Sequence, residues 1–226
     1  GNCGMNDMFN KNLLISLLGV ASLVVPGLAN ALVYQVNTGS GWQNLTTLSS
    51  AQTATQHYGP LNIGPGYAES DTAFMWLHTN TNTGDVAWGT LLDVNSDVTD
   101  GSANITLEGL PNSAYISFRD DGHEPGNIVA GTLNANWLWW GCCTDGVVID
   151  GMDGEWQVDV ELTSYTGINN WYFLTGDVNA PDRIALSDDF SVRAIDGASI
   201  PVPAPLALFA LGGVGVLLRN RRRARG

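Results

Sequence analysis

An unbroken alternation of polar and apolar residues over Glu155–Leu162 constrains the fold of this chain more than any other stretch. Successive side chains of a β-strand point to opposite faces of the sheet, so the apolar residues from Trp156 to Leu162 share one face. The charged and amide side chains between them share the other face. The pattern predicts a strand with one buried and one hydrated face.

Further runs of the same kind occur along the chain, separated by turn-forming pairs such as Asp100-Gly101 and Asp153-Gly154. These runs are Leu32–Val36, Ala73–Thr79, Val86–Val94, Ala103–Leu110, Ala114–Arg119, Ile128–Trp140, Trp171–Thr175, Arg183–Leu186 and Phe190–Ile195. No convincing amphipathic helix lies between them. Short strands with frequent turns predict an all-β fold, an antiparallel β-sandwich of jelly-roll or similar type, over residues 32–199.

The N-terminal segment has the layout of an export signal. Residues 8–31 place the basic Lys11 before the apolar run Leu13–Val25 and end in the small-residue cleavage site Ala29–Ala31, which predicts a secretory signal peptide cut after its last residue. Residues 1–7 are predicted to be an upstream extension without a role. An uncleaved membrane anchor is the alternative, although the apolar run is short for a membrane span.

The C-terminal segment, residues 200–226, contains three zones in succession. A proline-rich spacer is followed by an apolar run at 204–218, predicted to be a membrane helix, and by an arginine cluster at 219–225. As a helix the run would be about 22 Å long, against roughly 30 Å of bilayer hydrocarbon, so the span is short. Arginines stay on the cytoplasmic side, which places the preceding chain outside. A buried C-terminal helix with a basic end is the alternative.

This tail resembles the PEP-CTERM sorting signal of Gram-negative bacteria, in which a Pro-Glu-Pro-like motif precedes a membrane segment and an arginine cluster. The middle position of the motif is alanine here, where the family usually has glutamate. The resemblance covers only about residues 200–225. It implies an exosortase-type processing enzyme as a partner, passage through the inner membrane, and a final location in the cell envelope, at the outer surface or in the extracellular matrix. The residues that carry it are Pro203, Ala204, Pro205, Arg219, Arg221, Arg222 and Arg223.

The charge of the chain is distributed unevenly. The whole sequence carries a formal charge of −13, but residues 32–200 hold 21 acidic residues against three arginines and no lysine, a net charge of −18. Such a surface repels nucleic acid and anionic lipid, and it favours cations such as calcium. Nucleic-acid binding is therefore excluded. A hydrated acidic surface suited to a saline habitat is the alternative to metal binding.

The first stretch with potential chemistry is Arg119–Gly126, which gathers three carboxylates, Asp120, Asp121 and Glu124, around His123. This density of oxygen ligands is suited to Ca²⁺ or to a carboxylate pair for acid–base catalysis. The alternative is an ordinary hairpin turn with hydrated charges at its tip.

The second stretch, Asn134–Glu155, begins with three tryptophans, Trp137, Trp139 and Trp140, as candidate ligand-binding residues. On a strand the first two share one face and Trp140 lies on the other. A tryptophan on an exposed face would be a flat platform for sugar rings, whereas the alternative places all three in the core. The carboxylates that extend the candidate calcium set do not have EF-hand spacing, so the site would be irregular. They are Asp145, Asp150, Asp153 and Glu155.

Cys142 and Cys143 are the cysteines between the signal peptide and the tail. Adjacent Cα atoms lie about 3.8 Å apart, below the usual range of roughly 4.4–6.8 Å for disulfides, so a bridge between them would be a strained vicinal one. We expect that bridge in an oxidising envelope. Intermolecular pairing is the alternative.

The sequence contains no metalloprotease, serine-hydrolase or nucleotide-binding motif. We therefore expect an exported, non-enzymatic β-sandwich at the cell surface or in the exopolysaccharide matrix, binding glycans with calcium. One alternative is a polysaccharide-acting glycosidase or lyase, which needs only two well-placed carboxylates. Another is a structural surface subunit.

Overall fold

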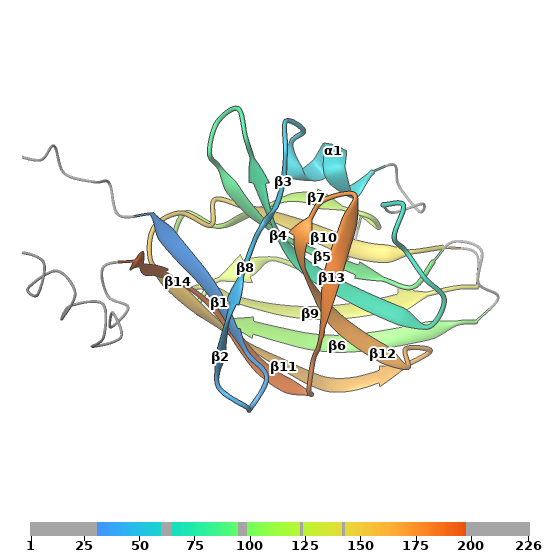
Figure 1. Ribbon diagram of the computed structural model, residues 1–226. Helices are drawn as coiled ribbons and strands as arrows, with labels where there is room; N and C mark the ends of the chain where they lie inside the picture. Colours follow the sequence, from blue (N-terminus) through green and yellow to red (C-terminus); the bar gives the residue numbers. More distant parts are fainter. Residues whose placement is uncertain (1–30, 60–64, 95–98, 123, 142, 198–226) are drawn as a thin grey trace, which may run out of the picture. The chain divides into compact units, whose positions relative to one another are not determined.

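The computed structural model describes residues 31–59, 65–94, 99–122, 124–141 and 143–197. In these residues the chain forms two β-sheets and one short helix (Figure 1), which confirms the predicted all-β class. Residues 1–30, which hold the predicted upstream extension and the predicted signal peptide up to its last residue, lie outside the described residues, and so does the whole sorting tail, from the proline motif to the arginine cluster. Among the described residues, no helix is long and apolar enough to cross a membrane.

The first sheet has seven strands, and every neighbouring pair in it is antiparallel. Their order across the sheet is β2 (Trp42–Leu45), β1 (Leu32–Asn37), β14 (Asp189–Asp196), β11 (Trp156–Thr166), β6 (Gly101–Glu108), β9 (Thr132–Trp139) and β8 (Ile128–Val129). Both edges of this sheet are formed by short strands.

The second sheet is mixed, which corrects the expectation of a purely antiparallel sandwich. β12 and β3 both run parallel to β4, and they pair with different parts of it. The reason is topological, because the chain visits the first sheet between β4 and β12, so no hairpin dictates their direction. The order is β13 (Ala180–Ala185), β12 (Asn170–Asp177), β4 (Thr72–Asn80), β5 (Val86–Leu92), β10 (Asp145–Asp150) and β7 (Tyr115–Arg119), with β3 (Leu48–Ser50) beside β4. The jelly-roll connectivity stays a prediction.

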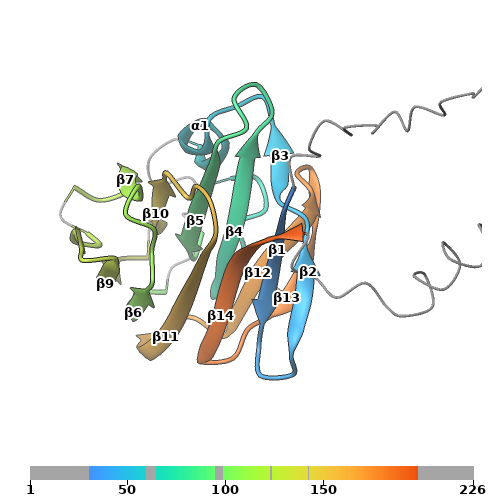
Figure 2. The same ribbon diagram turned by 90° about the vertical axis from the view of Figure 1, so that its left-hand side faces the viewer.

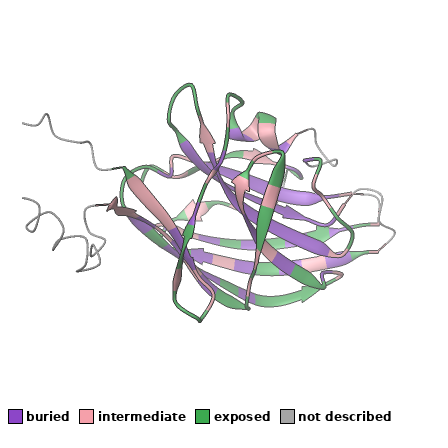
Figure 3. Cartoon of the chain, viewed as in Figure 1, coloured by how far each residue is buried: buried purple, intermediate pink, exposed green. Residues whose placement is uncertain are grey.

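The main core lies between the two sheets and takes side chains from both. Trp156, Val158 and Val160 of β11 point into it, and their exposed neighbours Gln157 and Asp159 point away, as the alternation predicts. Buried and exposed bands therefore alternate along the strands of the first sheet (Figure 3). Burial of this apolar face is the main driving force that the sequence supplies for the fold.

A second core covers the outer face of the second sheet. Phe74 and Trp76 of β4 belong to it, so β4 is buried on both faces. It is covered by the helix α1 (Ala54–Tyr58), which lies beside β5 and β10 in both views (Figures 1 and 2). The helix has one turn and a capping box between Thr53 and Gln56. It is too short for a helical period to be detected in the sequence. This extra layer leaves the first sheet as the one with a hydrated outer face.

Candidate functional site

The three candidate tryptophans separate into two environments. Trp137 and Trp139 of β9 are 2% and 1% exposed and belong to the main core, whereas Trp140, which directly follows the strand, is 64% exposed. The predicted division into two faces is confirmed. The rings of Trp137 and Trp139 cannot reach a ligand in solvent. Of the three predicted ligand-binding tryptophans, Trp140 is therefore the one that could stack on a sugar ring.

Trp139 is fixed in the core by close packing and by a buried acceptor. Its indole N–H donates to Asp93 Oδ2 at 3.1 Å, and its ring lies against Gly101, where a Cβ would stand 2.0 Å from Cζ2. The backbone N–H of Asp71 donates to the other oxygen of Asp93. Trp139 is therefore a structural residue that determines which face of β9 is presented outward.

The outer face of β9 continues across the sheet as a strip of amide and hydroxyl groups. Leu138 is 52% exposed and, with Trp140, ends this strip. Asn104 donates to Ser164 Oγ at 2.7 Å, and Thr106 donates to Asn134 Oδ1 at 3.2 Å. We call this surface the amide–hydroxyl strip. Its members are Ser102, Asn104, Thr106, Asn134, Asn136, Ser164 and Thr166, and sequence analysis missed it because cross-strand register is needed to assemble it.

Two acidic stretches that are separate in the sequence meet where β7 and β10 pair. The Asp120 N–H donates to the Gly146 carbonyl at 3.1 Å, which places Asp120 and Asp145 side by side. Asp120 is buried, and its Oδ2 accepts hydrogen bonds from Tyr58 (3.0 Å) and Thr144 (2.7 Å). Asp145 is 1% exposed, and its Oδ2 has no hydrogen-bond partner among the described residues.

We call Asp120, Asp121, Glu124 and Asp145 the acidic corner. Burial, followed by the neighbouring charges of Glu124, Asp121 and Asp120, raises the pKa of Asp145 to about 8. Burial also raises the pKa of Glu124, against the opposing effect of the Leu138 N–H, which donates to Glu124 Oε2 at 3.0 Å. That bond joins the acidic corner to the exposed end of the amide–hydroxyl strip.

The remaining carboxylates of the predicted calcium set lie elsewhere. Asp150 is at the far end of β10 from Asp145, about 16 Å away along a strand. It lines a different hollow together with Asp153, and Glu155 accepts the backbone N–H of Asp196 at 2.6 Å. The predicted set is therefore split, and within the described ranges no three His, Cys, Asp or Glu side chains are arranged to hold a metal ion.

A hollow of about 350 Å³ lies on the outer face of the first sheet, further along the strands from Trp140. Four carboxylates line it, with Glu108 opposite Asp159 and Glu161 opposite Asp189 in the strand register. Asp159 is held by the Ser191 hydroxyl at 2.6 Å. The alternation in β11 predicts that Asp159 and Glu161 lie on the hydrated face. Glu108 and Asp189 lie beside them because β6 and β14 are the neighbouring strands, which the alternation does not predict.

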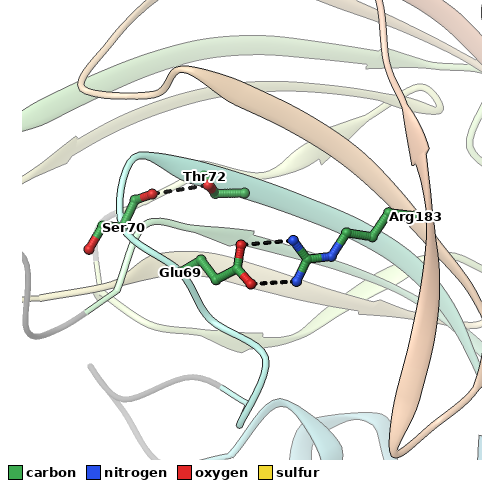
Figure 4. A network of polar contacts seen from close by, with 4 residues as sticks. All are labelled: Glu69, Ser70, Thr72 and Arg183. Carbon is green, nitrogen blue, oxygen red and sulfur yellow. Dashed lines mark hydrogen bonds and ion pairs between the residues drawn. The ribbon is translucent and has the colours of Figure 1, made fainter.

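All three arginines among the described residues are engaged in contacts within the protein. Arg119 donates to the turn that follows its own strand, and Arg193 donates twice to Gln35 Oε1. Arg183 binds both carboxylate oxygens of Glu69 (Figure 4). These arginine contacts therefore leave Asp121, Glu124, Asp145 and the carboxylates of the outer-face hollow without an arginine partner in the described chain.

Cys143 is disulfide-bonded. The predicted partner, Cys142, lies outside the described residues, as does His123 of the first acidic stretch. The Cys143 N–H donates to the Trp140 carbonyl at 3.0 Å, so the half-cystine closes the turn that carries the exposed tryptophan.

Comparison with known proteins adds no relative from which a role can be transferred. The chain matches no protein-family model, no curated protein and no solved structure. The function is therefore inferred from the residues and their geometry.

Proposed function

We propose that this protein is an exported, non-enzymatic glycan-binding protein of the cell surface or extracellular matrix, with its binding surface on the outer face of β9 and β6. The observation that carries the proposal is the pairing of the exposed Trp140 with the amide–hydroxyl strip. An aromatic face stacks on the apolar face of a sugar ring, and amides and hydroxyls exchange hydrogen bonds with its hydroxyl groups.

The charge of the surface narrows the ligand to neutral glycans, or to acidic glycans bridged by calcium. Residues 32–200 hold three arginines against 21 acidic residues, so an acidic polymer would be repelled unless a cation bridges the two surfaces. The acidic corner adjoins Trp140 through the bond between Leu138 and Glu124. We propose that Ca²⁺ binds at this corner after Asp121 and Glu124 turn toward Asp145, whose unpartnered oxygen can coordinate the cation once Ca²⁺ displaces the proton that the raised pKa of Asp145 retains.

Replacing Trp140 by alanine should weaken binding to neutral polysaccharides by about two- to tenfold, because loss of one stacking ring removes roughly 0.5–1.5 kcal/mol. Affinity electrophoresis or a glycan array measures the change. The Tyr115→Ala variant removes an aromatic ring of similar exposure from the second sheet and should bind as the parent does. Equal binding by the parent and the Trp140→Ala variant would refute the proposed surface.

The outer-face hollow favours a second candidate function, a carboxylate-based glycosidase. Directly opposite positions on neighbouring strands bring carboxyl groups to the separations that retaining and inverting hydrolases use, roughly 5–9 Å. Release of new reducing ends from the bound glycans, abolished in a Glu161→Gln variant, would establish hydrolysis. Binding without any such release supports the non-enzymatic proposal.

Export and sorting rest on the two terminal segments. We expect the native protein in the envelope or extracellular fraction, with a mass reduced by removal of the segment up to Ala31. Replacing Arg219, Arg221, Arg222 and Arg223 by alanine should trap unprocessed protein, because the tail then lacks its cytoplasmic anchor charge. Fractionation and mass spectrometry measure both results. Native protein in the cytosolic fraction would contradict the proposal.

A further inference from the structure

A second hollow, also of about 350 Å³, lies on the outer face of the second sheet beside the first turn of α1. In the strand register His78 lies opposite Ala87, and Tyr115 lies opposite Asp150. We call this site the imidazole hollow. Its volume is at the lower end of the range of small-molecule sites, roughly 300–1,000 Å³.

Three carboxylates, Asp85, Asp150 and Asp153, give the imidazole hollow its charge. Over the ranges that the structure describes, their side chains make no hydrogen bond and no ion pair, and no arginine or lysine lines the hollow. The arginines of the body are engaged elsewhere. The negative charge of the hollow is therefore available to a ligand.

The histidine at the inner wall of the hollow does not balance the negative charge of these carboxylates. His78 is 1% exposed, its Nε2 lies 2.9 Å from Ser50 Oγ, and its ring stacks on His57 at 4.9 Å between centroids. Burial lowers the pKa of His78, and burial followed by the neighbouring His78 lowers the pKa of His57 to about 4. Both rings are neutral at pH 7.

The rest of the wall combines an exposed aromatic ring with small residues. Tyr115 is 58% exposed, and the face of a tyrosine ring attracts an ammonium group. Ala54, Ala87 and Gly151 leave the space that larger side chains would fill. An aromatic ring, an amide from Asn80 and several carboxylates are the groups that bind a hydroxylated, positively charged molecule.

The arrangement of these groups distinguishes an organic cation from a metal ion. Within the described chain the carboxylates of this hollow do not form a metal-holding group. A ligand whose amine and hydroxyl groups are spread over a ring can reach carboxylates that do not converge on one point. We propose that the imidazole hollow binds a small amino sugar, a hydroxylated ring carrying a protonated amine. This inference is independent of the glycan surface proposed on the first sheet.

Titration calorimetry of the purified protein with glucosamine and with glucose tests the inference, because the two sugars share a ring and differ in the amine. At pH 6.5 glucosamine should bind saturably, and glucose should bind at least about tenfold more weakly, the loss expected for a charge-assisted hydrogen bond. The Asp85→Asn and Asp150→Asn variants should each weaken glucosamine binding by about fivefold or more.

Three controls make the outcome decisive. Asp182→Asn removes an exposed carboxylate from β13 at the opposite edge of the sheet and should leave binding unchanged. Tyr115→Ala removes the exposed ring of the hollow and should weaken glucosamine binding. Trp140→Ala should retain it, which separates this site from the proposed glycan surface. The inference is overturned by equal binding of the two sugars, by absence of saturable glucosamine binding, or by unchanged binding in the Asp85→Asn and Asp150→Asn variants.

Discussion

Relative to an Asp145→Asn variant, the free energy of unfolding should fall by about 2 kcal/mol between pH 6.5 and pH 9, because of one buried carboxyl group. Asp145 has a pKa of about 8 in the folded protein, whereas an unfolded aspartate titrates near pH 3.9. Over this interval the folded protein holds a proton that the unfolded chain has already released. The folded state therefore loses stability as the pH rises, the opposite of the usual behaviour of a salt-bridged aspartate.

The lower limit of the interval is set by the histidines. The pKa of His57 is lowered to about 4 and the pKa of His78 is also lowered, so below about pH 6.5 the unfolded chain binds protons that the folded state does not. Their contribution makes stability rise with pH in that acid range and opposes the effect of Asp145. An unfolded histidine is still half protonated at about pH 6.5 and becomes neutral about one pH unit higher, so the histidines raise stability slightly over the start of the interval. This rise is the same in the parent and in an Asp145→Asn variant, and the difference between the two proteins reports Asp145 alone.

Urea denaturation followed by tryptophan fluorescence at several pH values measures this slope. The Asp145→Asn variant carries no titrating group at this position and should lack the fall, keeping only the small rise from the histidines, whereas the exposed Asp182→Asn variant should keep the parent slope. Calcium binding at the acidic corner would restore stability at pH 9 in the parent and not in Asp145→Asn. A parent-like slope in Asp145→Asn would show that another group titrates.

The Gly101→Ala substitution should lower the free energy of unfolding by about 3 kcal/mol, at the upper end of overpacking effects. An added Cβ would lie 2.0 Å from Cζ2 and 2.2 Å from Cε2 of Trp139. The indole cannot retreat without breaking its hydrogen bond to Asp93, whose buried carboxylate would lose a donor. Thermal and urea denaturation of the variant measure the loss.

Two further variants test the cause of this loss. Gly66→Ala adds the same methyl group where no atom lies within 4 Å, and it should be nearly neutral. Combining Gly101→Ala with Trp139→Leu removes the ring that obstructs the methyl group, so the double variant should be less destabilised than the sum of the two single variants. Strict additivity would show that Gly101 is required for its backbone conformation instead.

Strand faces were predictable from the sequence because they depend only on period two. The alternation in β11 gives the buried Trp156 and the exposed Asp159 directly, and the same rule separates Trp139 from Trp140. Which of the two faces of β9 is covered depends on the opposite sheet. The sequence therefore leaves two alternatives for the candidate site, with either Trp140 or the pair Trp137 and Trp139 exposed, and the position of the opposite sheet decides between them.

Contacts that depend on register could not be predicted. Asp120 and Asp145 meet only because β7 pairs with β10 across a long connection, and nothing in either stretch encodes the other as its partner. The parallel pairing of β12 with β4 could not be predicted from the sequence for the same reason. The burial of both faces of β4 could not be predicted either, because the outer face is covered in part by the helix α1. This helix has one turn and is too short to show a helical period in the sequence.

The short edge strands of the first sheet bear on how such molecules behave when crowded. Exposed strand edges invite neighbouring chains to add on by hydrogen bonding, and short, interrupted or charged edges discourage this. β8 offers two residues, β2 offers four, and β13 of the second sheet carries Pro181 and Asp182. These three edges therefore disfavour edge-to-edge association of neighbouring copies at high concentration, and a strand that joins them would have to overcome their shortness or charge.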